Sequence, residues 1–73
     1  MNITKIKNML EENASKNVRF KFNGNRNQIE EFDGKIVNTY KYLFVVKPND
    51  TGIKRSFTYT DILIGNLEIH FED

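Results

Sequence analysis

The residues best suited to proton chemistry lie at the end of the chain, where His70 stands between Glu68 and Glu72. A histidine can act as a general base when a cleft holds it against a substrate. Residues two apart on a strand point to the same side, so these three side chains would share one outer face of a terminal strand. This pattern indicates a solvated surface, and we predict no catalytic residue there.

Three acidic residues near the middle of the chain, Glu30, Glu31 and Asp33, are the second candidate for acid–base chemistry. Glycoside hydrolysis needs two carboxylates that flank one bond. On a strand, Glu30 and Glu31 would point to opposite sides, so a solvated edge is the simpler interpretation. The chain has no cysteine and one histidine, which leaves no thiolate zinc site and no imidazole cluster. We predict that the protein is not an enzyme and has no metal or cofactor.

Basic and aromatic residues offer a different chemistry, the recognition of another macromolecule. We predict partner contact through seven of them: Arg19, Lys21, Arg26, Tyr40, Tyr42, Lys54 and Arg55. The cations would form a strip if the strand of Arg19 lies beside the strand of Arg55, and Tyr40, Tyr42 and Tyr59 would offer stacking faces to bases. The alternative is that these aromatic residues belong to the core and that the charges are merely solvated. The formal net charge of +1 argues against a general attraction to polyanions. A protein partner is therefore preferred, and nucleic acid remains the alternative.

Two residues are expected to shape the backbone. In the Thr60-Asp61-Ile62 segment, the Asp61 carboxylate can accept backbone amides and fix a turn. A ligand-binding role for Asp61 is the alternative. The apolar alternation between Ile29 and Phe32 slips and is followed by Gly34, which predicts a bulge or bend.

The elements that position these residues begin with a short helix over about residues 3–15. Ile3, Ile6, Leu10 and Ala14 recur at three- and four-residue steps, which is typical of an amphipathic helix. Asn2 or Thr4 can cap its first turn. A helix of this length is marginal in water, so we expect its apolar stripe to dock on the remainder of the chain.

After residue 17 the apolar period becomes two, which predicts strands. We expect five, over residues 18–22, 29–37, 43–46, 53–59 and 67–71. The third strand is apolar on both sides, which predicts either cover by the helix or a face for a partner or a second copy. No apolar run approaches the roughly 18 residues of a membrane span.

Together these elements predict one mainly β domain over residues 1–73, a five-stranded SH3-like barrel with a short N-terminal α-helix. The helix would cover an open end of a barrel formed by about residues 18–72. An Sm-like barrel, which has the same order of elements and binds RNA, is the alternative.

The chain resembles the Veg proteins, small SH3-like barrel proteins of Gram-positive bacteria. The matching segments are FKFNGNRNQIEEFDGKIVNTY (Phe20–Tyr40), YLFVVK (Tyr42–Lys47) and RSFTYTDILIGNLEIHF (Arg55–Phe71). The order and spacing of these elements carry the resemblance more than any one of them.

This resemblance implies a non-enzymatic cytoplasmic regulator. The family is linked to the control of biofilm genes by opposing a DNA-binding repressor, and it has no established catalytic residues. We therefore expect a Veg-like binding protein that modulates a transcriptional regulator by protein–protein contact. An RNA- or DNA-binding barrel is the alternative.

Overall fold

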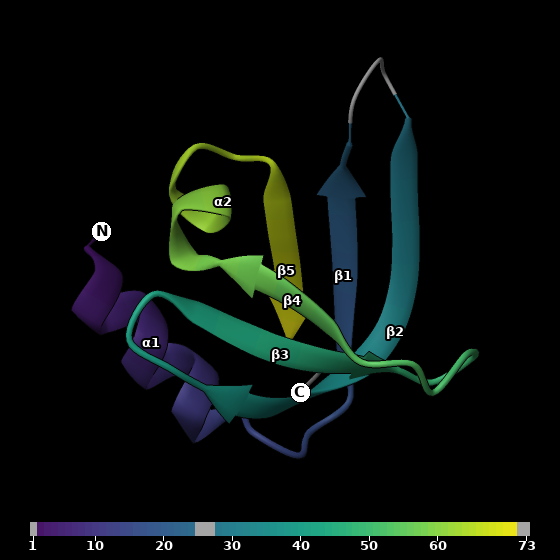
Figure 1. Ribbon diagram of the computed structural model, residues 1–73, viewed down its shortest axis with the longest axis horizontal. Coiled ribbons are helices and arrows are strands. Elements are labelled where there is room, and N and C mark those ends of the chain that lie inside the picture. Colours follow the sequence, from purple (N-terminus) through teal and green to yellow (C-terminus); the bar gives the residue numbers. More distant parts are fainter. Residues whose placement is uncertain (1, 25–27, 72–73) are drawn as a thin grey trace.

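The computed structural model describes residues 2–24 and 28–71. Its elements are, in chain order, α1 (Ile3–Glu12), β1 (Val18–Asn23), β2 (Ile29–Thr39), β3 (Leu43–Pro48), β4 (Arg55–Thr58), α2 (Tyr59–Leu63) and β5 (Leu67–Phe71). The predicted mainly β fold with a short N-terminal helix is confirmed (Figure 1).

The strands form one strongly curved antiparallel sheet with the order β4-β3-β2-β1-β5. Among the described residues, β4 and β5 are its two edges and do not pair with each other. The short helix α2 connects them and contacts both (Figure 1). On this side the two edge strands are therefore linked by helix packing and not by a further ladder of hydrogen bonds.

Helix α1 begins at one of the two predicted caps. The Asn2 side chain accepts a hydrogen bond from the Lys5 backbone N–H at 2.9 Å, which satisfies one of the free donors of the first turn. The helix ends at Glu12, before the predicted residue 15. The Asn13 side chain donates to the Met9 carbonyl at 2.8 Å, and Ser15 adopts a φ of 70°, a conformation that cannot continue a helix.

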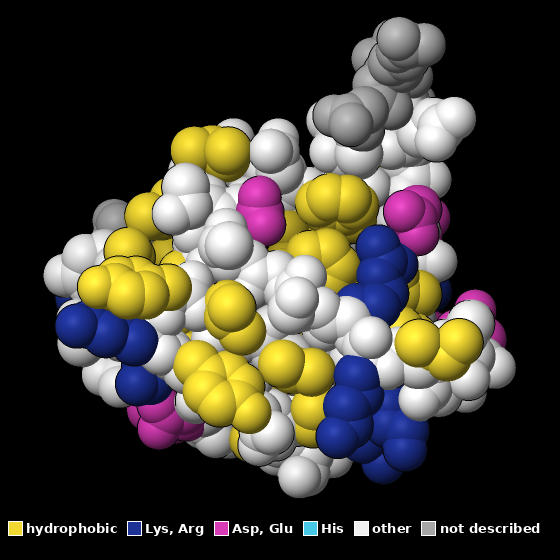
Figure 2. Space-filling view, viewed as in Figure 1, with side chains coloured by type: hydrophobic (Ala, Val, Ile, Leu, Met, Phe, Trp, Pro, Cys, Tyr) yellow, Lys and Arg dark blue, Asp and Glu magenta, His cyan; other side chains and the backbone are white. Residues whose placement is uncertain are grey.

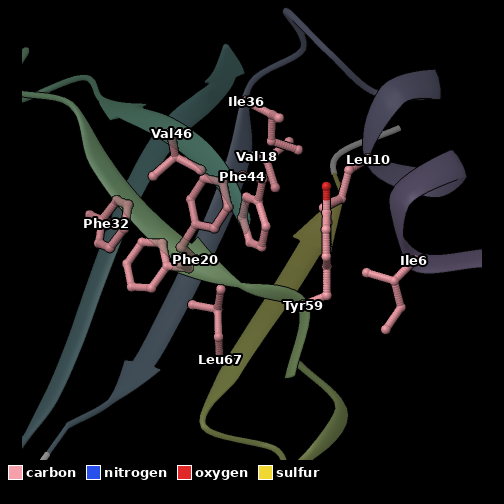
Figure 3. Close-up of a cluster of buried hydrophobic side chains, with 11 residues drawn as sticks. Ile6, Leu10, Val18, Phe20, Phe32, Ile36, Phe44, Val46, Tyr59 and Leu67 are labelled. Carbon is pink, nitrogen blue, oxygen red and sulfur yellow. The ribbon is translucent and has the colours of Figure 1, made fainter. Parts of the chain in front are cut away.

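The core lies inside the curved sheet and receives side chains from every element. It consists of Ile6, Leu10, Val18, Phe20, Phe32, Ile36, Phe44, Val46, Phe57, Tyr59 and Leu67. Figure 3 shows Ile6 and Leu10 of α1 beside Tyr59, at one end of this cluster. Burying each large apolar side chain contributes about 1.5–3 kcal/mol, so α1 is held by the sheet and not by its own propensity.

Strand β2 bends around this core, but not at the residue that the sequence indicated. The register with β3 shifts between Ile36 and Asn38, two residues after Gly34. Gly34 itself is paired with both neighbours, Val18 of β1 and Pro48 of β3. A Cβ atom at Gly34 would lie 2.7 Å from the Lys47 carbonyl oxygen. The glycine therefore permits a close approach of β2 and β3, and the bulge follows it.

The corner before β5 is the helix α2, fixed by a reciprocal capping box. The Thr58 hydroxyl accepts from the Asp61 N–H at 3.2 Å. The Asp61 carboxylate accepts from the Thr58 N–H at 3.1 Å. The backbone N–H groups of Thr58 and Asp61 lie at the start of the helix, where they have no acceptor within the helix itself. Asp61 therefore accepts a backbone amide at this corner, in the manner that its sequence context suggested.

Candidate functional site

The predicted contact residues Arg19 and Lys21 lie on the outer side of β1, and acidic residues lie beside both. Arg19 is directly opposite Asp33, and Lys21 is opposite both Glu31 and Glu68. The Arg19 guanidinium approaches Asp33 at 3.3 Å and Glu31 at 3.5 Å. The Lys21 ammonium lies 3.9 Å from the Glu68 carboxylate. We call these five side chains the paired face, because each cation on it has an anionic neighbour.

Arg55 points to the inner side of β4, in the same direction as Phe57. Its guanidinium lies 5.2 Å from the ring centres of both Phe32 and Phe57, and donates to the Glu30 carboxylate at 2.9 Å. A guanidinium over aromatic rings is attracted by their quadrupole. Arg55 thus covers the aromatic core at the end of the barrel opposite α1, which leaves it little freedom to meet a partner.

The structure does not bring these cations into one strip. The predicted strip required β1, with Arg19, to lie beside β4, with Arg55. In the sheet these two strands are separated by β2 and β3, so the prediction of a strip is wrong. Lys54 is exposed immediately before β4. Arg26 lies outside the described residues.

The two predicted tyrosines lie together on the connection between β2 and β3. The Tyr40 side chain is 50% exposed and that of Tyr42 is 69% exposed. The backbone N–H of Tyr40 donates to the Leu43 carbonyl at 2.8 Å, which closes the turn. The Lys41 ammonium lies 5.3 Å from the Tyr42 ring centre. Two large aromatic side chains are thus presented on an ordered turn, a feature common at protein interfaces.

A buried tyrosine of α2 anchors this turn from inside. The Tyr59 hydroxyl donates to the Tyr40 carbonyl, and the Tyr59 N–H donates to the Tyr42 carbonyl at 3.4 Å. The Tyr59 side chain is fully buried and stacks on Phe44 at 5.6 Å. Burial raises the pKa of the Tyr59 hydroxyl, and the nearby Glu11 carboxylate also raises it. The hydroxyl therefore stays protonated and keeps donating to the turn at neutral pH.

Next to this turn, the outer side of β3 carries apolar side chains and an unpaired lysine. Leu43, Val45 and Lys47 point outward, in alternation with the buried Phe44 and Val46. We define the β3 face as these outward residues of β3, two exposed residues of β2 and the two tyrosines of the turn: Lys35, Val37, Tyr40, Tyr42, Leu43, Val45 and Lys47. Polar residues border it, because Val45 lies opposite Asn38 of β2 and Ser56 of β4. Figure 2 views the front of the molecule, where hydrophobic side chains gather over β3 and β4 and basic side chains lie at the left edge, right of centre and at the lower right.

Helix α1 leaves this face uncovered. It contacts β2 and α2, and its buried residues Ile6 and Leu10 enter the core. Leu43 is 36% exposed and Val37 is 38% exposed. Of the two explanations for an apolar third strand, cover by the helix therefore does not apply to the outer side.

Sequence reasoning missed Lys35, Lys47 and Val37 as candidates. The strand alternation places Lys47 outward with Leu43 and Val45, and this signal was present in the sequence. The missing information was the pairing of β2 with β3, which sets Lys35 directly opposite Lys47.

Among the described residues, the candidates for proton chemistry lie on open surface. His70 is opposite Arg19 and, with Glu68, lines an open hollow of about 410 Å³ beside β5. Glu31 and Asp33 belong to the paired face, and Glu72 lies outside the described residues. Within residues 2–24 and 28–71 there is no group of three histidine, cysteine or acidic residues that could hold a metal ion. No described helix has the length and apolar character needed to cross a membrane.

Comparison with known proteins agrees with the resemblance seen in the sequence. The model of the family described as "Biofilm formation stimulator VEG" matches residues 1–70, almost the whole chain. No curated protein matches the sequence. Because the match covers both helices, the first four strands and β5 up to His70, the chain belongs to the Veg family of biofilm formation stimulators.

Proposed function

We propose that this protein is a non-catalytic cytoplasmic binding protein, which promotes biofilm formation by contacting a transcriptional regulator of biofilm genes. The family assignment supports the link to biofilm formation. The proposal of protein–protein contact rests on one observation, the exposed apolar and aromatic β3 face. Contiguous apolar surface on a small domain is typical of an interaction site.

The charge distribution favours a protein partner over nucleic acid. Phosphate binding depends on several cations that are free to release counterions. Arg19, Lys21 and Arg55 are each engaged by a carboxylate. The β3 face, by contrast, is mostly apolar, and aliphatic residues such as Leu43 and Val45 suit the side chains of a protein.

The test is capture of partners on the immobilised full chain from a nuclease-treated extract of a biofilm-forming Gram-positive bacterium. We expect a DNA-binding regulator among the captured proteins, identified by mass spectrometry. Its capture should be lost with Tyr42→Ser combined with Leu43→Ser. It should be kept with Ile29→Ser, because Ile29 is 56% exposed at the other end of β2.

A second measurement asks whether the contact has a regulatory effect. The purified regulator is bound to its operator DNA, and the wild-type protein is added in a mobility-shift experiment. Release of the DNA by wild type, but not by the Tyr42/Leu43 double variant, is the expected result. The capture experiment is also run with an extract that has not been treated with nuclease. A regulator that is captured from the untreated extract but not from the treated one would indicate a nucleic acid partner and would overturn the proposal.

A further inference from the structure

The strongest unexplained feature of the molecule is a pair of lysines that face each other across two strands. Lys35 of β2 and Lys47 of β3 are direct Cα partners, and both are exposed. Like charges directly opposite each other in a sheet are destabilising. Among the cations on the described strands, Arg19, Lys21 and Arg55 are ion-paired, whereas these two lysines have no described carboxylate as a partner.

The surroundings of the pair are shaped to receive a short side chain. A shallow hollow of about 250 Å³ is lined by Lys35, Val37, Lys47, Pro48, Asn49 and Gly52. Two ammonium groups and aliphatic walls suit a carboxylate that is carried on an apolar stem. The apolar part of the β3 face lies next to this hollow, because Val45 is the next outward residue of β3 before Lys47.

We infer that Lys35 and Lys47 bind a carboxylate of the partner, and that this partner docks through an amphipathic segment with acidic and aliphatic side chains. The inference rests on the proposed function and specifies its partner chemistry. The carboxylate would relieve the repulsion between the two ammonium groups, while aliphatic side chains cover Val45 and Leu43. Charge complementarity at this one point sets the register of the segment on the sheet.

Docking occurs through side chains and not by strand addition. Strand β3 is paired with β2 on one side and with β4 on the other, so its backbone donors and acceptors serve the sheet. Affinity must therefore come from apolar contact and from the lysine pair. A phosphate backbone would need several free cations along its path. Arg19, Lys21 and Arg55 are in ion pairs, and the exposed Lys41 and Lys54 lie in the connections before β3 and β4 and not on the sheet.

The test uses the full chain labelled with ¹⁵N and two synthetic peptides, one of alternating leucine and glutamate and one of alternating leucine and glutamine. We expect the glutamate peptide to shift the amide signals of Lys35, Leu43, Val45 and Lys47. The glutamine peptide should bind about tenfold more weakly, because each exposed ion pair changes affinity by up to about fivefold and the two lysines together by at most about 25-fold.

Variants then assign the effect to the lysines. Lys35→Gln combined with Lys47→Gln should weaken binding of the glutamate peptide about tenfold. The control Lys21→Gln, on the paired face, should leave it within about twofold. Equal affinity for both peptides, or shifts confined to other strands, would overturn the inference. Tighter binding of a single-stranded RNA oligonucleotide at the same residues would also overturn it, in favour of a nucleic acid partner.

The same variants separate this inference from the proposed function. If the captured regulator is lost with the Tyr42/Leu43 double variant but retained by the double lysine variant, the carboxylate site is wrong and the proposed function stands. If neither variant loses the regulator, the β3 face is not its binding surface and both are wrong.

Discussion

Two regions on the outer side of the sheet, the paired face and the β3 face, place their lysine and arginine residues in different surroundings. On the paired face, Arg19 and Lys21 of the central strand β1 lie between acidic residues of β2 and β5. On the β3 face, Lys35 and Lys47 oppose each other among apolar side chains. A cation with an anionic neighbour is already paired, whereas the two opposed lysines have no carboxylate partner among the described residues. This difference is the reason why we propose the β3 face, and not the paired face, as the surface that contacts a partner.

The largest effect is expected where the two faces meet on β2. Gly34→Ala places a methyl group 2.7 Å from the Lys47 carbonyl oxygen, so β2 and β3 must separate. We expect a loss of about 2 kcal/mol in the free energy of unfolding, the usual cost of overpacking, measured by urea denaturation. Gly24→Ala is the matched control, because the nearest atom outside its neighbours lies 3.5 Å away. Equal stability of both variants would show that the close approach is not required.

The next prediction concerns the anchor beneath the β3 face. Tyr59→Phe removes the hydrogen bond to the Tyr40 carbonyl, with an expected loss of about 1 kcal/mol at neutral pH. Tyr42→Phe, on a side chain that is 69% exposed, should leave stability unchanged.

The Tyr59 substitution should also change the dependence of stability on pH. The pKa of Tyr59 is raised in the folded state, so above about pH 10 the unfolded state releases this proton first. Wild type should therefore lose stability as the pH rises past that value, and Tyr59→Phe should lose less. Thermal unfolding at a series of alkaline pH values measures this. Parallel curves for the two proteins would contradict the buried, protonated hydroxyl.

A similar loss is expected at the corner that holds α2. Asp61→Ala removes the carboxylate that accepts the Thr58 N–H, and losing such a cap costs about 1 kcal/mol. Thr60→Ala, at an exposed neighbouring position, is the control. An unchanged melting temperature together with lost partner binding would mean that Asp61 is a contact residue and not a structural one.

The smallest expected changes in stability compare the two faces most directly, because a lysine-to-glutamate substitution should raise stability on one face and lower it on the other. Lys47→Glu turns a repulsive pair with Lys35 into an attractive one and should raise stability by about 0.5 kcal/mol. Lys21→Glu places a third acid between Glu31 and Glu68 and should lower stability by a similar amount. Chemical denaturation at low ionic strength detects both changes, which should shrink in high salt. Changes of the same sign would remove the electrostatic distinction between the faces.

Much of this molecule was predictable because its strands have one buried side. The alternation of Val18 and Phe20 with Arg19 and Lys21 predicted β1, and the apolar stripe predicted α1. The slip in apolar alternation before Gly34 predicted a bulge near that residue, but the register shift lies between Ile36 and Asn38. Register depends on the partner strand as well as on the residues themselves, and that information is not local.

The candidate site was likewise predictable only as far as local sequence patterns allow. Three tyrosines were candidates for stacking by residue type, but only the structure separates the exposed Tyr40 and Tyr42 from the buried Tyr59. Residue type alone predicted which cations contact a partner. It favoured Arg19, Lys21 and Arg55, which have acidic partners in the fold. The strand alternation indicated that Lys47 points outward, but not that Lys35 lies opposite it, because an unpaired lysine looks like a paired one until its neighbours across the sheet are known.

By itself, the sequence determined which side of each strand is buried, where the helix begins and which family the chain belongs to. These depend on side chains that are close together along the chain or on the order of short motifs. Only the tertiary structure decided which charges are neutralised and which remain free. Charge pairing is set by residues that meet across strands, such as Arg19 with Asp33 and Lys35 with Lys47, and these partners are brought together only by the order and register of the folded sheet.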